Sequence, residues 1–287
     1  MFLPSKEKPF YYCLKVMQHM NYYPFAKDLH DLEKYRRVAL SIRVLTCFPL
    51  FECLLHLVMS YKNKVPIDYL ADLVVLISSI NAIIICNMFQ MYNKDYSKLF
   101  LDLHEMTDFG VVPKMAHTIK RLQLYSKLCF WYCIVGTILY MLESVFISSV
   151  TCRESNKIKG IHEICNSATM IWWPYDEIHP IALILINLIE IICISYYLPP
   201  SAIVLIIVWE STQIITLKMF HLKQLLKKTF TIDSEGWRRQ HLRFCIQYHQ
   251  KLLRLAKDLS NINKKVFGHA LICGTLIGCT LFQSLRV

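Results

Sequence analysis

The sequence predicts an all-α fold, that of a polytopic helical membrane protein. Of its 287 residues, 55% are hydrophobic and 18% are charged, and the mean hydropathy is +0.36. Since a soluble domain carries about 25% charged residues, this composition argues against a soluble protein. Five apolar runs are each long enough for a helix of roughly 20 residues that crosses a bilayer. The 7 Gly and 10 Pro exclude collagen-like and low-complexity chains.

Residues 1–37 precede the first apolar run, and we expect them to form a cytoplasmic N-terminal segment. Charged and aromatic residues are mixed here, and no apolar core ends in a small-residue cleavage site. The segment is therefore not expected to act as a signal peptide.

The apolar runs define the expected membrane helices. They cover residues 38–60, 69–92, 128–150, 180–217 and 266–285. The fourth run is too long for one perpendicular crossing, and Pro199 and Pro200 lie in its middle. It could form one bent helix or two short crossings.

The placement of lysine and arginine decides between these alternatives. The N-terminal segment and the loops after the second and fourth runs carry about four times as many of them as the other connections. The positive-inside rule therefore places the N-terminus and these two loops in the cytoplasm. Two crossings in the fourth run would put the most basic loop outside, so we expect this run, 180–217, to form one bent helix. Residues 38–217 then contain the first four membrane helices. The net charge of +11 is thereby explained by orientation, and no nucleic-acid partner is expected.

Residues 218–265 should form a cytoplasmic loop with an amphipathic helix that leads into the last span, 266–285. Mostly apolar residues recur there at spacings of three and four, a pattern typical of a packed helix face. The stripe comprises Leu242, Cys245, His249, Leu252, Ala256, Leu259, Asn263 and Val266. The intervening basic residues indicate a solvated face, or else a membrane-surface or calmodulin-target helix.

The loop 151–179 should be extracellular, and its length favours a folded lid or a partner surface. Cys152 and Cys165 lie well outside the bilayer in this loop, where an oxidising compartment would allow a disulfide between them. No Cys-x-x-Cys pair occurs among the 12 cysteines, so no metal site and no thioredoxin-like chemistry is expected.

Several ionisable residues fall within the expected spans, where charge is costly. Asp72 lies near a span end and can face the interface, while Glu52 and His56 are one helical turn apart and can satisfy each other. Glu143 and Glu190 fall in or near the outer halves of their helices. We expect a polar contact between spans there rather than a ligand or ion site.

Two stretches resemble the insect odorant receptor family of seven-helix proteins. The first is Trp172-Trp173-Pro174-Tyr175-Asp176, which is similar to an aromatic-Pro-aromatic-Asp element before the fourth helix. The second runs from Cys245-Ile246-Gln247-Tyr248-His249-Gln250 through Leu252 and Leu259 to Phe282-Gln283, and is similar to the region around the fifth helix. The cytoplasmic N-terminus and the order of loops agree with this resemblance.

The resemblance implies an odour-tuned subunit in the cell membrane of olfactory sensory neuron dendrites. Such a subunit assembles with a co-receptor into a hetero-tetramer, binds small volatile molecules in the outer half of the helix bundle and gates a cation channel. The cytoplasmic helix ends form the subunit contact, which assigns that role to Cys245, His249, Leu252 and Leu259. Five spans of an expected seven are present, so we expect a C-terminally truncated chain that conducts no odorant-gated current by itself.

The predicted topology brings together the start of the second span, the end of the third and the start of the fourth. Candidate ligand-binding residues there form an apolar and aromatic set with one serine hydroxyl, suited to a volatile ligand. They are Leu73, Ile77, Tyr140, Ser144, Ile147, Ile184 and Leu188. Ordinary helix packing is the alternative role for each of them.

Other functions find less support in the sequence. A gustatory-receptor-like channel subunit shares the topology and is the nearest alternative. A multi-pass transporter should show internal repeats or paired interrupted helices, and only the Pro199-Pro200 interruption occurs. No catalytic or cofactor-binding motif is visible, so neither an enzyme nor a cofactor is expected.

Overall fold

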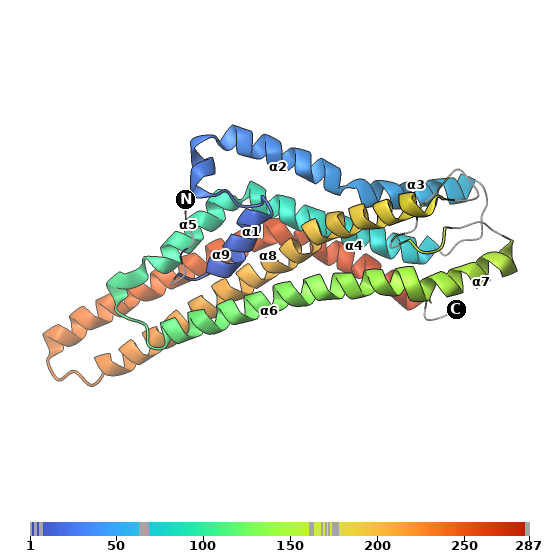
Figure 1. The fold of residues 1–287 in the computed structure, drawn as a ribbon. Coiled ribbons are helices and arrows are strands. Elements are labelled where there is room, and N and C mark those ends of the chain that lie inside the picture. Colours follow the sequence, from blue (N-terminus) through green and yellow to red (C-terminus); the bar gives the residue numbers. More distant parts are fainter. Residues whose placement is uncertain are drawn as a thin grey trace. The chain divides into compact units, whose positions relative to one another are not determined.

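The computed structural model describes residues 2, 5, 8–62, 69–160, 164–167, 169, 171, 173 and 178–284, and this part of the chain is helical with connecting turns (Figure 1). The long helices are α2 (Leu32–Thr46), α3 (Phe48–Lys62), α4 (Tyr69–Met91), α6 (Met115–Leu142), α8 (Pro180–Thr229) and α9 (Glu235–Ser284). The short helices are α1 (Tyr11–His19), α5 (Asn93–His104) and α7 (Ser149–Lys159). Two 3₁₀ turns, Ala26–His30 and Met106–Phe109, and a π-helical turn, Glu143–Ser148, complete the fold.

Four helical stretches of the described chain are long and apolar enough to cross a membrane. They are Leu32–Lys62, Asp72–Met91, Met115–Phe146 and Pro180–Thr229. They overlap the first four apolar runs, although the third begins at Met115 instead of 128 and the fourth ends at Thr229 instead of 217. This overlap confirms the all-α, multi-pass class. The fifth run belongs to α9 and is helical as far as Ser284, and its role as a membrane crossing stays a prediction, as does the orientation of all the spans.

The fourth run forms a single helix, α8, with Pro199 and Pro200 inside it. Proline has no N–H, so the carbonyls of Ser195 and Tyr196 lose their usual donors four residues on. In this turn the Ser201 hydroxyl donates to the carbonyl of Leu198 at 2.7 Å. The prediction of one long helix rather than two short crossings is therefore confirmed.

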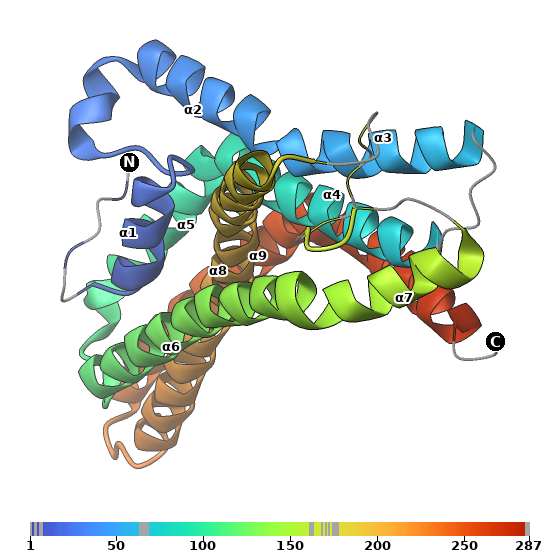
Figure 2. The ribbon, with the colours of Figure 1, turned by 45° about the vertical axis from the view of Figure 1, so that its right-hand side comes forward.

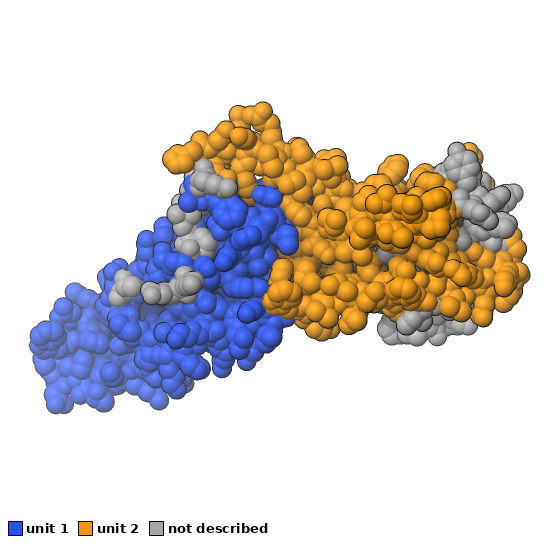
Figure 3. Space-filling model, in the orientation of Figure 1, with its two compact units in different colours: residues 1–26, 87–129, 203–268 blue, residues 27–86, 130–202, 269–287 orange. Residues whose placement is uncertain are grey.

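The chain divides into two compact units (Figure 3). Unit 1 comprises residues 1–26, 87–129 and 203–268, and unit 2 comprises residues 27–86, 130–202 and 269–287. Each unit combines segments that are far apart in the sequence. Four helices, α4, α6, α8 and α9, contribute residues to both units.

In unit 1 the N-terminal segment supplies a large part of the core. The aromatic rings of Phe10 and Phe100 stack at 4.3 Å, and Tyr23 is fully buried. The Tyr23 hydroxyl lies 2.7 Å from both the carbonyl of Phe2 and the hydroxyl of Ser97 on α5. Because burial of one such side chain contributes about 1.5–3 kcal/mol, residues 1–26 are an integral part of this unit.

A buried carboxylate, Glu210 on α8, lies deeper in unit 1. It accepts a hydrogen bond from Ser126 on α6 at 2.5 Å and a weaker one from the Cys13 thiol of α1 at 3.7 Å. Glu210 is only 1% exposed. A buried acceptor needs such donors, so these contacts fix α1 against α6 and α8.

Within unit 1 the C-terminal part of α8 and the N-terminal part of α9 form a helical hairpin, with the two helices side by side in both ribbon views (Figures 1 and 2). The Thr229 hydroxyl contacts both His241 and Cys245. The buried stripe of α9 repeats at spacings of three and four, as predicted. It consists of Cys245, Tyr248, Leu252, Leu255, Leu259, Ile262 and Val266.

The register of this stripe differs from the predicted one at every second position. His249 and Ala256 are exposed, and Tyr248 and Leu255 occupy the buried positions instead. Leu242, which was predicted to pack, is exposed as well. Adjacent residues on a helix are about 100° apart, so either member of a pair such as Tyr248 and His249 could lie near the packed face. The contacts with the neighbouring helices decide which of the two side chains is buried.

Candidate ligand-binding cavity

Unit 2 contains a cavity of about 190 Å³. It is lined from α3, α4, the end of α6, the π-helical turn, α7 and the loop that follows α7. The lining residues are Cys53, Asp72, Val75, Tyr140, Glu143, Ser144, Ser149, Cys152, Ile164, Cys165, Asn166, Ser167 and Thr169. An apolar cavity of about 150 Å³ takes up benzene, so this space accommodates a small organic molecule.

The π-helical turn Glu143–Ser148 positions one side of the cavity. In such a turn the hydrogen bonds run to the fifth residue, which shifts the side chains that follow around the helix axis, and π-turns are frequent at functional sites. Tyr140 lies in the last α-helical turn before it, and Glu143 and Ser144 begin it. All three line the cavity.

A disulfide joins Cys152 in α7 to Cys165 in the following loop, with the two Cα atoms 5.6 Å apart. The predicted pairing is therefore confirmed. The Arg153 guanidinium donates to the Asn166 side chain at 3.3 Å, and the Asn156 amide approaches the Cys165 sulfur at 3.4 Å. These links hold the loop against α7 and make both cysteines part of the cavity wall.

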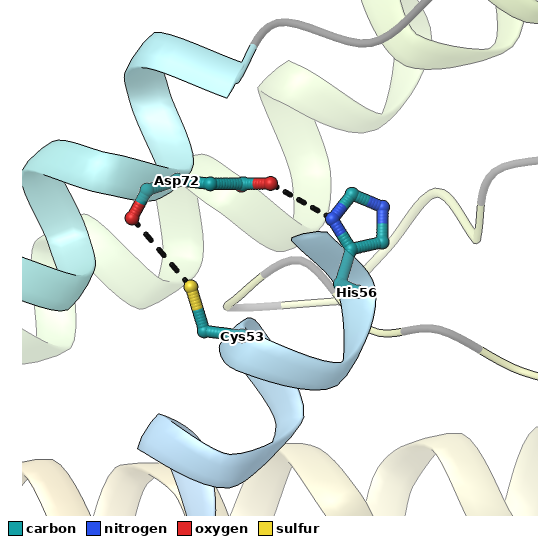
Figure 4. A network of polar contacts seen from close by, with 3 residues as sticks. All are labelled: Cys53, His56 and Asp72. Atoms are coloured by element: carbon teal, nitrogen blue, oxygen red, sulfur yellow. Dashed lines mark hydrogen bonds and ion pairs between the residues drawn. The ribbon is translucent and has the colours of Figure 1, made fainter. Parts of the chain in front are cut away.

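A buried polar pair connects α3 with α4 at the cavity (Figure 4). His56 Nδ1 lies 2.8 Å from Asp72 Oδ2, and the two residues are 4% and 2% exposed. The Cys53 thiol, one turn before His56, donates to the backbone carbonyl of Asp72 at 3.5 Å. Asp72 lies in the first turn of α4, where the helix dipole favours a carboxylate.

This pair corrects two predictions. His56 contacts Asp72 rather than Glu52, and Asp72 is buried rather than at an interface with water. The partner of Glu52 is Glu190 of α8. Glu190 is fully buried and accepts a hydrogen bond from the Thr169 hydroxyl, so it forms a polar contact between helices, as expected.

Of the seven predicted ligand-binding residues, Tyr140 and Ser144 line the cavity. Ile77 is half-buried, and it does not belong to the lining. The side chain of Ile147 lies outside the described residues. The role of this set as a whole stays a prediction.

The other three members of that set, Leu73, Ile184 and Leu188, are 37%, 59% and 50% exposed. The buried residue Glu190 defines the inner face of this part of α8. Ile184 and Leu188 lie roughly 120° and 160° around the helix axis from Glu190. Both are therefore on the outer face of α8, which does not face the cavity.

Sequence reasoning missed Asp72, Cys53 and the loop residues as part of the cavity wall. Asp72 carried a usable signal, because a carboxylate within an apolar run often faces a cavity. The loop residues Asn166 and Ser167 gave no such signal, since the disulfide that places them could only be proposed. In the described ranges no three His, Cys, Asp or Glu side chains are grouped so that they could hold a metal ion.

The four residues predicted for the subunit contact lie on α9. Cys245, Leu252 and Leu259 are buried in the core of unit 1, with at most 6% exposure, whereas His249 is exposed. Three of the four side chains thus pack within the chain itself, and His249 alone of this set is accessible to a partner.

Comparison with known proteins identifies the family. The family model described as "7tm Odorant receptor" matches residues 66–287, which include every lining residue of the cavity except Cys53. A search of curated proteins gives no match. The Trp172–Asp176 element, apart from Trp173, lies outside the described residues. With a family match over most of its length and apolar helices that suit a bilayer, this multi-pass membrane protein belongs to the odorant receptor family, whose members are receptors and not enzymes.

Proposed function

We propose that the protein is an odorant receptor subunit that binds a small volatile molecule in the cavity of unit 2. The observation that carries the proposal is the cavity itself, which is walled by four helices, the π-helical turn and a disulfide-linked loop, nearly all of it within the family match. In this proposal the receptor assembles with a co-receptor subunit into a hetero-tetramer and gates a cation channel in the dendrite membrane of an olfactory sensory neuron.

The lining supports a ligand of mixed character. Val75, Ile164 and the ring of Tyr140 offer apolar surface, and dispersion contacts there would hold a hydrocarbon skeleton. The hydroxyls of Ser144 and Ser149 add hydrogen-bonding groups. Ligand sites typically combine an apolar lining with a few polar groups that fix the orientation.

Ligand binding is tested with a substitution that fills the cavity. Ser144→Leu places a branched side chain in the space, so it should weaken the binding of larger odorants and shift tuning towards smaller ones. Ser41→Leu is the matched control, because Ser41 is exposed on α2, also in unit 2, and should leave binding unchanged. Equilibrium binding to the purified protein in nanodiscs measures both. If Ser144→Leu leaves every affinity unchanged, the cavity is not the binding site.

Gating is tested separately by voltage clamp of cells that express the co-receptor together with a receptor subunit that contains this chain. An odorant-evoked cation current that Ser144→Leu retunes is the expected result. If Ser144→Leu leaves the current evoked by every odorant unchanged, the cavity does not control gating.

A further inference from the structure

We propose that the cavity of unit 2 prefers small organic amines in their protonated form, whose ammonium group binds the carboxylate of Asp72. This inference rests on the proposed function and deepens it, because it names the chemical class of the ligand. It is drawn from the charges in the cavity wall and from the hydrogen-bonding groups that the wall leaves open.

The charged groups in the wall are of one sign. Asp72 and Glu143 are the ionisable carboxylates among the described lining residues, and no lysine or arginine accompanies them there. Thr169 of the wall donates a hydrogen bond to Glu190 behind it, and Glu52 contacts Glu190 in turn. A cavity lined by one sign of charge attracts ligands of the opposite sign, so the wall favours a cation and disfavours an anion.

Asp72 retains accepting capacity after its contact with His56. A carboxylate has about four acceptor sites, and the contact between Asp72 Oδ2 and His56 Nδ1 at 2.8 Å uses only one of them. Asp72 is only 2% exposed, so bulk water solvates it poorly. Since a buried carboxylate is stabilised by charged hydrogen-bond donors, an ammonium group in the cavity would supply such a donor.

The wall also offers acceptors for the remaining protons of an ammonium group, which has three donors. The Ser167 hydroxyl is buried without a partner in the described part of the chain. The hydroxyl of Ser144 lies beside that of Tyr140. Hydroxyl oxygens accept hydrogen bonds readily, so two carboxylates and several hydroxyls surround the same space.

Three ligands with one carbon skeleton separate charge from shape. 3-Methylbutylamine carries a positive charge at neutral pH, as a lysine side chain does, while 3-methylbutanol is neutral and 3-methylbutanoic acid is negative. A charge-assisted hydrogen bond is roughly twice as strong as a neutral one. The wall should therefore rank the amine first, the alcohol second and the acid last.

The test measures the Kd of each ligand for the full chain in nanodiscs, by equilibrium dialysis at neutral pH. The amine should bind about tenfold more tightly than the alcohol. If the alcohol or the acid binds as tightly as the amine, the inference is overturned and the proposed ligand site stands. If none of the three binds at millimolar concentration, the inference falls together with the site.

Asp72→Asn tests the assigned group while leaving an oxygen that can still accept from His56. It should lower amine affinity about tenfold and change alcohol affinity by less than twofold. Asp233→Asn is the matched control, because Asp233 is exposed in the turn between α8 and α9. If Asp72→Asn does not fold, Glu143→Gln serves as the second variant. It should lower the affinity for the amine by a smaller factor and leave the affinity for the alcohol unchanged. Equal losses for amine and alcohol in the folded variant would overturn the assignment to charge.

Discussion

Removal of the Cys152–Cys165 disulfide should loosen α7 and the wall of the cavity that it supports. The bridge joins residues 13 positions apart. For a closed loop of this length the chain-entropy relation gives about 3 kcal/mol of stabilisation at 25 °C. The change tested is the double substitution Cys152→Ser and Cys165→Ser, or reduction of the wild-type protein.

The structure indicates that α7 depends on this bridge. It has 11 residues, fewer than the roughly 12–15 that an isolated helix needs in water. Among its described side chains Ser149 is buried and the others are half-buried or exposed. Little apolar burial therefore opposes unfolding of α7, and most of the 3 kcal/mol should appear as local stability.

Hydrogen–deuterium exchange of the α7 peptides measures this local stability. A loss of about 3 kcal/mol raises the exchange rate on the order of a hundredfold, because each 1.4 kcal/mol is a factor of ten. The Arg153–Asn166 contact at 3.3 Å survives the change, so this figure is an upper bound. The affinity for cavity ligands should fall in parallel.

The matched control removes two cysteines that form no bridge, Cys273 and Cys279. Their conversion to serine should leave exchange in α7 unchanged, and reductant should still accelerate it in this control. If oxidised wild type, reduced wild type and the double-serine variant at 152 and 165 exchange at the same rate, the bridge does not order α7 and the reasoning fails.

Two further predictions concern buried polar groups. His56→Ala should destabilise the protein by roughly 3 kcal/mol, because it leaves the Asp72 carboxylate buried without its partner; an unchanged thermal midpoint in detergent would contradict this. Burial raises the pKa of Tyr23 from 10.0 to about 12, so the stabilisation from its neutral form is fully present below pH 10 and is lost as the pH rises through 12. Tyr23→Phe should flatten this decline in the thermal midpoint, and the same slope in both proteins would show that another group causes it.

Much of the fold could be predicted because each membrane helix is a local property of the chain. In a bilayer every backbone N–H and C=O must be paired within the segment, so an apolar run of sufficient length forms a helix. The four runs from 38–60 to 180–217 obey this rule. Charge placement correctly indicated one helix through Pro199 and Pro200, although proline disfavours a helix interior.

The candidate site could be predicted only in part. Tyr140 and Ser144 were predicted near the end of the third span, and the structure places both of them in the wall. Ile184 and Leu188 lie on the opposite face, since the rotation of α8 depends on Glu190 and its contacts with α3 and the loop. A span's limits fix its length, whereas its rotation depends on its neighbours.

The sequence by itself determined the helical membrane class, the approximate positions of four long apolar helices and the two cysteines available for a bridge. Only the tertiary structure decided that His56 pairs with Asp72, that Tyr248 rather than His249 is buried, and that the wall of the cavity is acidic. The reason is geometric. Hydrophobic length and charge are properties of one stretch of sequence. The partner of a side chain depends instead on how each helix is rotated about its axis, and a shift of one residue rotates the contacting face by about 100°.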